Sequence, residues 1–127
     1  MVTPASAKPL ALIIEDDDKL VTIYTQALKI AEFDTQHVCD GNDALELLNT
    51  IQPAVVLLDL HLPGTGGDKV LARIRHDERL KGTQVILATA DQLMADMLIE
   101  ESDFVLEKPV SFGQLRDLAV RLRSTLN

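Results

Sequence analysis

Residues 54–67, AVVLLDLHLPGTGG, run from an unbroken apolar stretch into a single acid, Asp59, and then into a loop rich in glycine. A continuous apolar run of this length is typical of a strand buried on both faces of a parallel sheet. Comparable runs stand at 10–14 and 84–88, with a shorter one at 104–106 and a weaker candidate at 35–38. The sequence therefore predicts five strands.

Between these runs, apolar residues recur at the three- and four-residue spacing of an amphipathic helix. The predicted helices carry their apolar residues within 20–31, 44–51, 70–74, 93–98 and 112–126. Strict alternation of strand and helix implies right-handed crossovers and a parallel sheet covered by helices on both faces. We therefore predict an α/β, doubly wound architecture.

The composition excludes several classes of protein. The chain has 127 residues, a net charge of −8 and one cysteine, Cys39. A lone cysteine rules out an internal disulfide framework and favours a reducing, cytoplasmic compartment. The acidic excess argues against direct nucleic-acid binding, and no apolar stretch approaches the ~20 residues of a membrane helix. Residues 1–9 are expected to be a disordered lead-in, and residues 10–127 one domain.

Polar residues follow four of the predicted strands. Asp59 ends the run at 54–58, Thr89 ends the run at 84–88, and Lys108-Pro109 closes the last strand. The first strand is followed by the acids Glu15, Asp16 and Asp17. Because ligands of open parallel sheets bind beyond the carboxyl ends of the strands, we expect these side chains to form one site.

The residue types at these strand ends suit phosphoryl transfer. Crowded carboxylates raise one another's pKa or else require a cation, and Mg²⁺ (or Mn²⁺) prefers oxygen ligands. Asp59 would attack phosphorus, Lys108 would neutralise the phosphoryl oxygens, and Thr89 would sense the product. The simpler interpretation is an acidic helix start for Asp17 and Asp18, and a helix-capping role for Thr89.

Four blocks, IIEDDDKL (13–20), VVLLDLHLPGTGG (55–67), VILATA (85–90) and FVLEKPV (104–110), resemble in order and spacing the signature of the response-regulator receiver domain. The resemblance covers the chain from about residue 10 onward. It implies a flavodoxin-like (βα)5 three-layer sandwich with a parallel five-stranded sheet in the order 2-1-3-4-5.

The resemblance also implies a role for individual residues. It makes Asp59 the phosphoacceptor and Asp16 the direct metal ligand of the pair Glu15–Asp16. The remaining implied roles are metal coordination by the backbone carbonyl of His61, a switch hydroxyl at Thr89 with Ala90 beside it, phosphate contact by Lys108, and a cis peptide bond between Lys108 and Pro109.

Two departures from the family pattern concern the switch. Receiver domains usually carry an aromatic residue three positions before the lysine, where this chain has Val105; its aromatic residue is Phe104, one position earlier. A one-residue offset on a strand points to the opposite face, so Phe104 is expected to pack under a helix or to be partly exposed. The segment from Thr89 to Lys108 is also shorter than usual. We hypothesise an altered activation surface around the fourth helix.

Two further side chains are expected to tune the lifetime of the phosphoryl group. His61 lies two residues after Asp59, and Asp91 lies two residues after Thr89. In receiver-like proteins these positions flank the path of the hydrolytic water. The imidazole of His61 is not expected to bind the metal, because Mg²⁺ prefers oxygen and no second histidine or cysteine lies nearby in the sequence.

The predicted function is therefore Mg²⁺-dependent phosphoryl transfer to Asp59 from a sensor histidine kinase or a histidine phosphotransfer protein. Phosphorylation would switch a surface for a downstream output protein or domain, with a phosphorylation-dependent homodimer as a further option. Such a chain catalyses only its own phosphorylation and dephosphorylation.

Two alternatives stay open at this point. One is a pseudo-receiver that binds partners without phosphorylation. The other is a haloacid-dehalogenase-like phosphatase, which fits less well because those enzymes usually show Asp-x-Asp, whereas this chain has Asp59-Leu60-His61 and no room for a cap domain.

Overall fold

The computed structural model describes residues 8–126 and contains a five-stranded parallel sheet in the order β2-β1-β3-β4-β5. The strands are β1 (Leu10–Ile14), β2 (Asp34–Val38), β3 (Val55–Asp59), β4 (Gln84–Thr89) and β5 (Phe104–Glu107). The helices are α1 (Asp18–Ile30), α2 (Gly41–Leu47), α3 (Gly67–His76), the 3₁₀ turn η2 (Glu78–Leu80), α4 (Gln92–Leu98) and α5 (Phe112–Ser124). The predicted doubly wound fold is confirmed.

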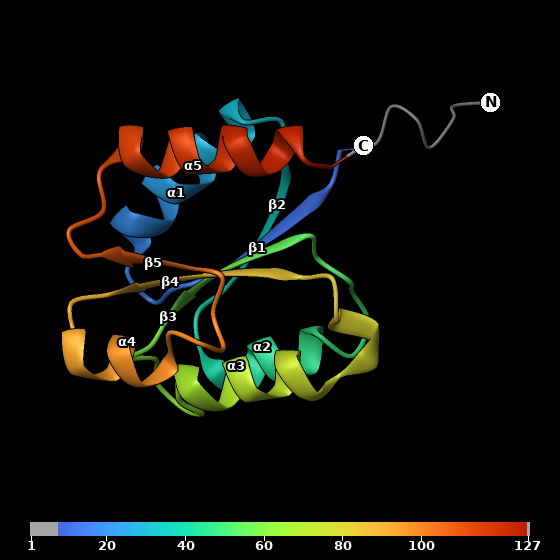
Figure 1. Cartoon of the computed structure of the whole chain (residues 1–127), viewed down its shortest axis with the longest axis vertical. Coiled ribbons are helices and arrows are strands. Elements are labelled where there is room, and N and C mark those ends of the chain that lie inside the picture. The colour runs from blue at the N-terminus through green and yellow to red at the C-terminus, as the bar shows by residue number, and fades with distance from the viewer. Residues whose placement is uncertain (1–7, 127) are drawn as a thin grey trace.

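Three layers are visible in Figure 1, with α1 and α5 on one face of the sheet and α2, α3 and α4 on the other. Alternate residues of the central strands feed the two cores. Ile13 and Leu57 pack with α1 and α5, whereas Ile14 and Leu58 pack with α2 and α3. Strand β3 is buried along its whole length, which explains its unbroken apolar run and fixes Asp59 at its carboxyl end.

Two helices end earlier than the apolar spacing suggests. The backbone N–H of Asn49 donates to Glu46 and that of Thr50 to Leu47, so the end of α2 tightens into turns and Ile51 lies beyond the helix. Leu126 lies beyond α5 but still packs on the α1–α5 core. In both cases the apolar contact continues after the helical hydrogen bonding has stopped.

The acids that follow β1 divide into two kinds. The carboxylate of Asp17 accepts hydrogen bonds from the backbone N–H groups of Lys19 and Leu20 and caps α1, and Asp18 occupies the first turn. The helix-start interpretation therefore holds for this pair. Glu15, in contrast, is buried and belongs to the sheet edge.

Residues 1–7 of the expected lead-in lie outside the described residues. Lys8 forms an ion pair with Glu32, and the carbonyl of Pro9 accepts a hydrogen bond from Asp34. The division into a lead-in over 1–9 and one domain over 10–127 stays a prediction. Among the helices of residues 8–126, none is both long and apolar enough to cross a membrane.

Tyr24 of α1 is an unusual member of the core beneath the sheet edge. Its side chain is buried, and among the described residues its hydroxyl has no hydrogen-bond partner. Burial, together with the negative charges of Glu15 and Asp59, raises the pKa of Tyr24 to about 12. The hydroxyl is therefore neutral throughout the physiological range.

Replacing Tyr24 with Phe is expected to leave the free energy of unfolding unchanged or to raise it by about 1 kcal/mol. An unpartnered buried hydroxyl is destabilising, and Phe removes it while keeping the ring. Urea unfolding monitored by circular dichroism measures the difference. Tyr24→Leu serves as the volume control and should destabilise the fold, because it removes the ring packing. A loss of more than about 1 kcal/mol in Tyr24→Phe would show that the hydroxyl is bonded.

Candidate functional site

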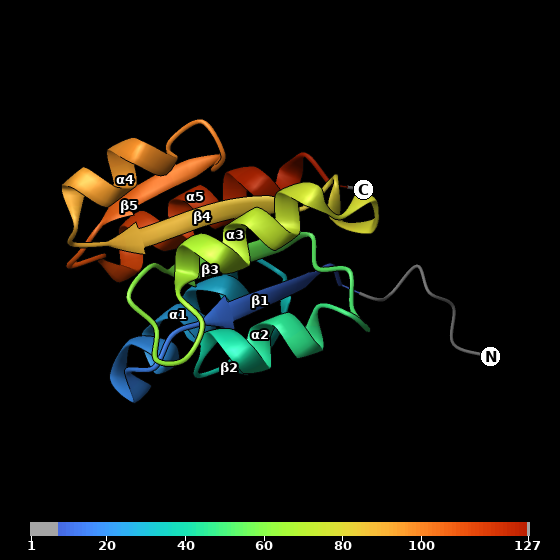
Figure 2. The same cartoon turned by 90° about the horizontal axis from the view of Figure 1, so that it is seen from below.

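The carboxyl ends of β1 and β3 bring three acids together. Each of Glu15, Asp16 and Asp59 offers a carboxylate oxygen, and these atoms lie within 4.8 Å of one another. Figure 2 shows the strands ending on one side of the sheet, next to the loop that precedes α3. Glu15 and Asp59 are buried, whereas Asp16 is exposed. The predicted cluster is therefore present, with one member facing solvent.

Lys108 lies between two of these acids. Its Nζ is 2.9 Å from Oε1 of Glu15 and 3.6 Å from Oδ1 of Asp59. The backbone N–H of Lys108 donates to the carbonyl of Thr89, which fixes the residue next to the end of β4. The Lys108–Pro109 peptide bond is cis, as expected. One ammonium group thus partly compensates two buried carboxylates, and the contact with Glu15 is the shorter one.

The environment of Glu15 disfavours its charge. Burial of the carboxyl and the nearby negative charge of Asp59 raise its pKa, against the opposing effect of Lys108. The desolvation penalty is the largest of these effects, so Lys108 only partly offsets the cost of a charged Glu15 carboxylate.

The loop after β3 holds Asp59 closely. The backbone N–H of His61 donates to Oδ1 of Asp59 at 3.1 Å. Gly67, the first residue of α3, packs against the same turn, and a Cβ at this position would lie 2.5 Å from the carbonyl oxygen of Asp59. Only glycine permits this approach of α3 to the strand end.

Thr89, Asp91 and His61 form a connected set beside the acids. The hydroxyl of Thr89 accepts a hydrogen bond from the N–H of Asp91 at 3.0 Å, and the carboxylate of Asp91 accepts one from the N–H of Met94 and so caps α4. Nε2 of His61 is 3.1 Å from Oδ2 of Asp91. The N–H of Met94, with a smaller contribution from His61, holds the pKa of the Asp91 carboxyl below its usual range.

The His61–Asp91 contact joins the two positions that were expected to tune the phosphoryl lifetime. The sequence indicated both residues but gave no sign that they touch, because they are 30 positions apart. The side chain of His61 is 63% exposed and that of Asp91 is 36% exposed, so the pair lies at the outer rim of the site and not within its buried part.

Phe104 and Val105 point to opposite faces of β5, as the one-residue offset predicted. Phe104 is half-buried and packs on the core formed with α1 and α5. Val105 packs on the core formed with α2, α3 and α4. The β5 side chain on the α4 face is therefore a small aliphatic group, while the aromatic ring lies on the α5 face.

The acid cluster fits a hard divalent cation. Its three members provide carboxylate oxygens, the donors that Mg²⁺ prefers, and they lie close enough together for one ion to reach all of them. The raised pKa of Glu15 supports the same conclusion, because added positive charge would relieve the crowding of like charges.

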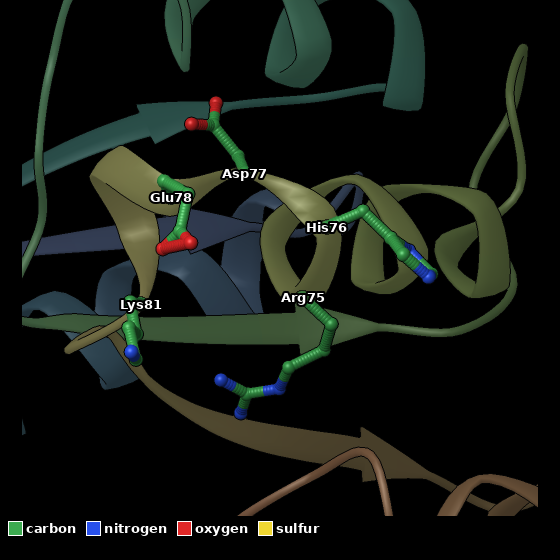
Figure 3. Close-up of a pocket in the computed structure, with 5 residues that line it drawn as sticks. All are labelled: Arg75, His76, Asp77, Glu78 and Lys81. Atoms are coloured by element: carbon green, nitrogen blue, oxygen red, sulfur yellow. The ribbon is translucent and has the colours of Figure 1, made fainter.

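A hollow in the surface lies away from this cluster, at the end of α3. It is lined by Arg75, His76, Asp77, Glu78 and Lys81 (Figure 3). Asp77 and His76 point away from Arg75 and Lys81 in this view. Arg75 is also occupied, since it pairs with Asp103 at 2.6 Å. The hollow therefore lacks a convergent set of free polar groups, and the strand ends remain the candidate site.

Comparison with known families gives a match over most of the chain. The model of the response regulator receiver domain matches residues 11–120. Among solved structures, the receiver domain of the Francisella response regulator 1452 is 26% identical, with a TM-score of 0.81 over 94% of this chain and 99% of that one. A CheY-like receiver domain from Methylobacillus flagellatus is also 26% identical, with a TM-score of 0.80 over 91% and 99% of the two chains.

Curated relatives include longer proteins. The DNA-binding dual master transcriptional regulator RpaA of Synechocystis sp. is 31% identical over 93% of this chain and 49% of its own length. The transcriptional regulatory protein AfsQ1 of Streptomyces coelicolor is 34% identical over 93% of this chain and 51% of its own length. The chain thus spans about half the length of the curated relatives it matches.

The raised pKa of Glu15 predicts that the metal-free protein loses stability as the pH rises. Stability associated with this group is fully present below its ordinary pKa of 4.5 and is lost as pH rises through the higher pKa of the folded state. Glu15→Gln has no such proton linkage. In EDTA, the free energy of unfolding of the wild type should therefore fall relative to that of Glu15→Gln between about pH 4 and about pH 7.

Urea unfolding at both pH values measures this difference. Glu46→Gln, which alters an exposed acid of α2, is the matched control and should track the wild type. If the free energy of unfolding changes with pH in the same way for the wild type and for Glu15→Gln, the raised pKa of Glu15 is contradicted.

Proposed function

Because the chain belongs to the response regulator receiver domain family, we propose that Asp59 is its phosphoacceptor. The protein is a receiver domain of two-component signalling, a signalling domain and not a conventional enzyme. The observation that carries the assignment of Asp59 is its position at the end of a fully buried strand, within reach of Lys108 and inside the acid cluster.

Asp59 would act as the nucleophile. One of its carboxylate oxygens forms a bond to phosphorus, while the bond from phosphorus to the donor, a phosphohistidine nitrogen or the oxygen of a small acyl phosphate, breaks with its electrons passing to the leaving group. Hydrolysis returns the chain to its unphosphorylated form, since water attacks phosphorus, inorganic phosphate leaves and the carboxylate of Asp59 is released. The chain would thus catalyse only its own phosphorylation and dephosphorylation.

Lys108 would stabilise the charge that collects on the phosphoryl oxygens. Its Nζ lies 3.6 Å from Asp59 and is held there by its ion pair with Glu15. It can therefore pair with a new anion after a small displacement. The N–H of His61 donates to the carboxylate of Asp59 and orients it for attack.

We assign the metal site to Asp16 and Asp59, with Glu15 beside them and the backbone carbonyl of His61 as a further ligand. Mg²⁺, or Mn²⁺ in its place, supplies positive charge that offsets the crowded carboxylates and the incoming phosphoryl group. Support comes from the oxygen-only donor set and from the mutual approach of the three acids.

Thr89 and Asp91 would convey the state of the site to α4. The hydroxyl of Thr89 accepts the N–H of Asp91, whose carboxylate both caps α4 and contacts His61. When the Thr89 hydroxyl turns to donate to a phosphoryl oxygen, the Asp91 N–H would lose its acceptor, which would loosen the residue whose carboxylate caps α4. Ala90, between the two residues, would move with them.

The partners follow from the same family assignment. We propose a sensor histidine kinase or histidine phosphotransfer protein as the phosphoryl donor, and a downstream protein or domain as the recipient of the signal. A phosphorylation-dependent homodimer is a further form of output. A cytoplasmic location stays a prediction from the single cysteine.

Incubation with Mg²⁺ and acetyl phosphate, followed by mass measurement of the intact protein, tests the proposal. The wild type should gain the mass of one PO₃H unit, and Asp59→Asn should not, because an amide is a poor nucleophile toward phosphorus. Asp43→Asn, which alters an exposed acid of α2, is the matched control and should be modified like the wild type.

The same experiment distinguishes the two alternatives. No adduct from any donor would favour the pseudo-receiver. Rapid turnover of external phosphoesters would favour the phosphatase, although the complete set of Asp16, Asp59, Thr89 and Lys108 supports the receiver.

The position of Phe104 predicts how activation differs from the usual pattern. With a phosphoryl mimic bound, Phe104 should remain on the α5 face, because moving its ring to the α4 face would require β5 to turn over. Matched structures with and without the mimic measure this. An ordinary rearrangement of α4 with Phe104 turned inward beside Thr89 would contradict it.

A further inference from the structure

Helix α4 exposes an unusual amount of apolar surface. Leu93 is 73% exposed and Met97 is 75% exposed, and Ile99, directly after the helix, is 56% exposed. We call these three residues the α4 patch. Of the α4 residues only Ala95 is fully buried, so most of the helix faces outward. In both cartoon views α4 lies at the edge of the molecule beside β5, with no element on its outer side (Figures 1 and 2).

The other large exposed apolar side chains of the described residues, Ile30 and Val120, come singly from two different helices. In the α4 patch, by contrast, three such side chains lie within seven residues, and the four-residue spacing of Leu93 and Met97 puts them on one side of the helix. Isolated exposed apolar residues need no explanation, but two on one helix face with a third directly after the helix indicate a contact surface.

The stretch of sequence that contains the patch carries charges of a single sign. Residues 82–107 include six acids and no lysine or arginine, although the chain as a whole has 12 basic residues. Ion pairs occupy two of these acids, Asp91 with His61 and Asp103 with Arg75. The other four are exposed and form no ion pair within residues 8–126: Asp96, Glu100, Glu101 and Glu107.

From this combination we propose that the α4 patch binds a basic amphipathic helix of a partner protein. The apolar face of such a helix would cover Leu93 and Met97, and its flanking lysine or arginine side chains would pair with Asp96 and Glu100. Apolar contact supplies most of the affinity, and the acidic border selects basic partners and speeds association.

A second copy of the chain is a poorer occupant. A two-fold contact of α4 with α4 would place like charges against one another. Of the three arginines of α5, Arg116 pairs with Asp117 and Arg123 donates to backbone carbonyls of Glu32 and Leu126. This leaves the exposed Arg121 as the basic side chain of this helix that a second copy could offer. Anionic membranes and nucleic acids are disfavoured by the same acidic border.

This inference names the kind of partner for the surface that the proposed function switches, but binding itself does not require Asp59 to be phosphorylated. All measurements therefore use the unphosphorylated chain and its Asp59→Asn variant. If Asp59 proves not to be the phosphoacceptor, the binding result is unaffected.

The probe is a synthetic helical peptide with leucine on one face and lysine elsewhere, compared with the same pattern carrying glutamate in place of lysine. Titration followed by amide chemical shifts should show binding of the lysine peptide, with perturbed resonances confined to α4 and β5. The double variant Leu93→Ser/Met97→Ser should weaken binding about tenfold or more, since a tenfold loss corresponds to about 1.4 kcal/mol. Asp96→Asn/Glu100→Gln should weaken binding several-fold and reduce its salt dependence.

Two matched controls separate the surface from general stickiness. Ile30→Ser/Val120→Ser removes exposed apolar groups elsewhere, and Asp43→Asn/Glu46→Gln removes exposed acids of α2; both should bind like the wild type. Equal binding of the glutamate peptide, unchanged affinity in the Leu93/Met97 variant, or perturbed resonances away from α4 would overturn the proposal. Self-association that depends on Leu93 and Met97 and is not displaced by the peptide would assign the patch to a second copy instead.

Discussion

The ammonium group of Lys108 between Glu15 and Asp59 is the interaction on which the rest of this structure depends. Two buried carboxylates at neighbouring strand ends repel each other, and one cation 2.9 and 3.6 Å away only partly compensates them. Burial still raises the pKa of Glu15. The fold tolerates this strain because β1 and β3 are packed on both faces and cannot separate. The site is therefore held ready for added positive charge, with its geometry set in advance.

Sequence patterns predicted the strands, because a strand buried on both faces leaves an unbroken apolar run. They also predicted that Asp59, Thr89 and Lys108 share one edge, because parallel strands end on the same side. Strand order came only from the family resemblance, since periodicity carries no information about which strands are neighbours. The His61–Asp91 contact and the unpartnered hydroxyl of Tyr24 could not be predicted, because both depend on side-chain positions across the fold.

The opposite faces of Phe104 and Val105 show how a shift of one residue along a strand changes a mechanism. Strand alternation puts the ring against α5 and leaves a small valine facing α4. A ring beside Thr89 would connect the site to the surface by packing. Here the connection consists of hydrogen bonds through Asp91, which touches Thr89, His61 and the start of α4. Directional bonds weaken over smaller displacements than packed contacts do, so in the proposed switch a short movement of Thr89 would be enough to disturb the start of the helix.

The weak attachment of α4 and the character of its surface have a common cause. A seven-residue helix that fully buries only Ala95, with Met94 and Leu98 partly buried against the core, gains less from packing than its longer neighbours. The cap that Asp91 provides therefore weighs more in its stability. The apolar side chains that do not contact the core remain outside, where Leu93 and Met97 face solvent. The same limited packing that would let the proposed switch move α4 thus leaves apolar surface exposed for a partner. A more deeply packed helix would be more stable, but it would not offer that surface.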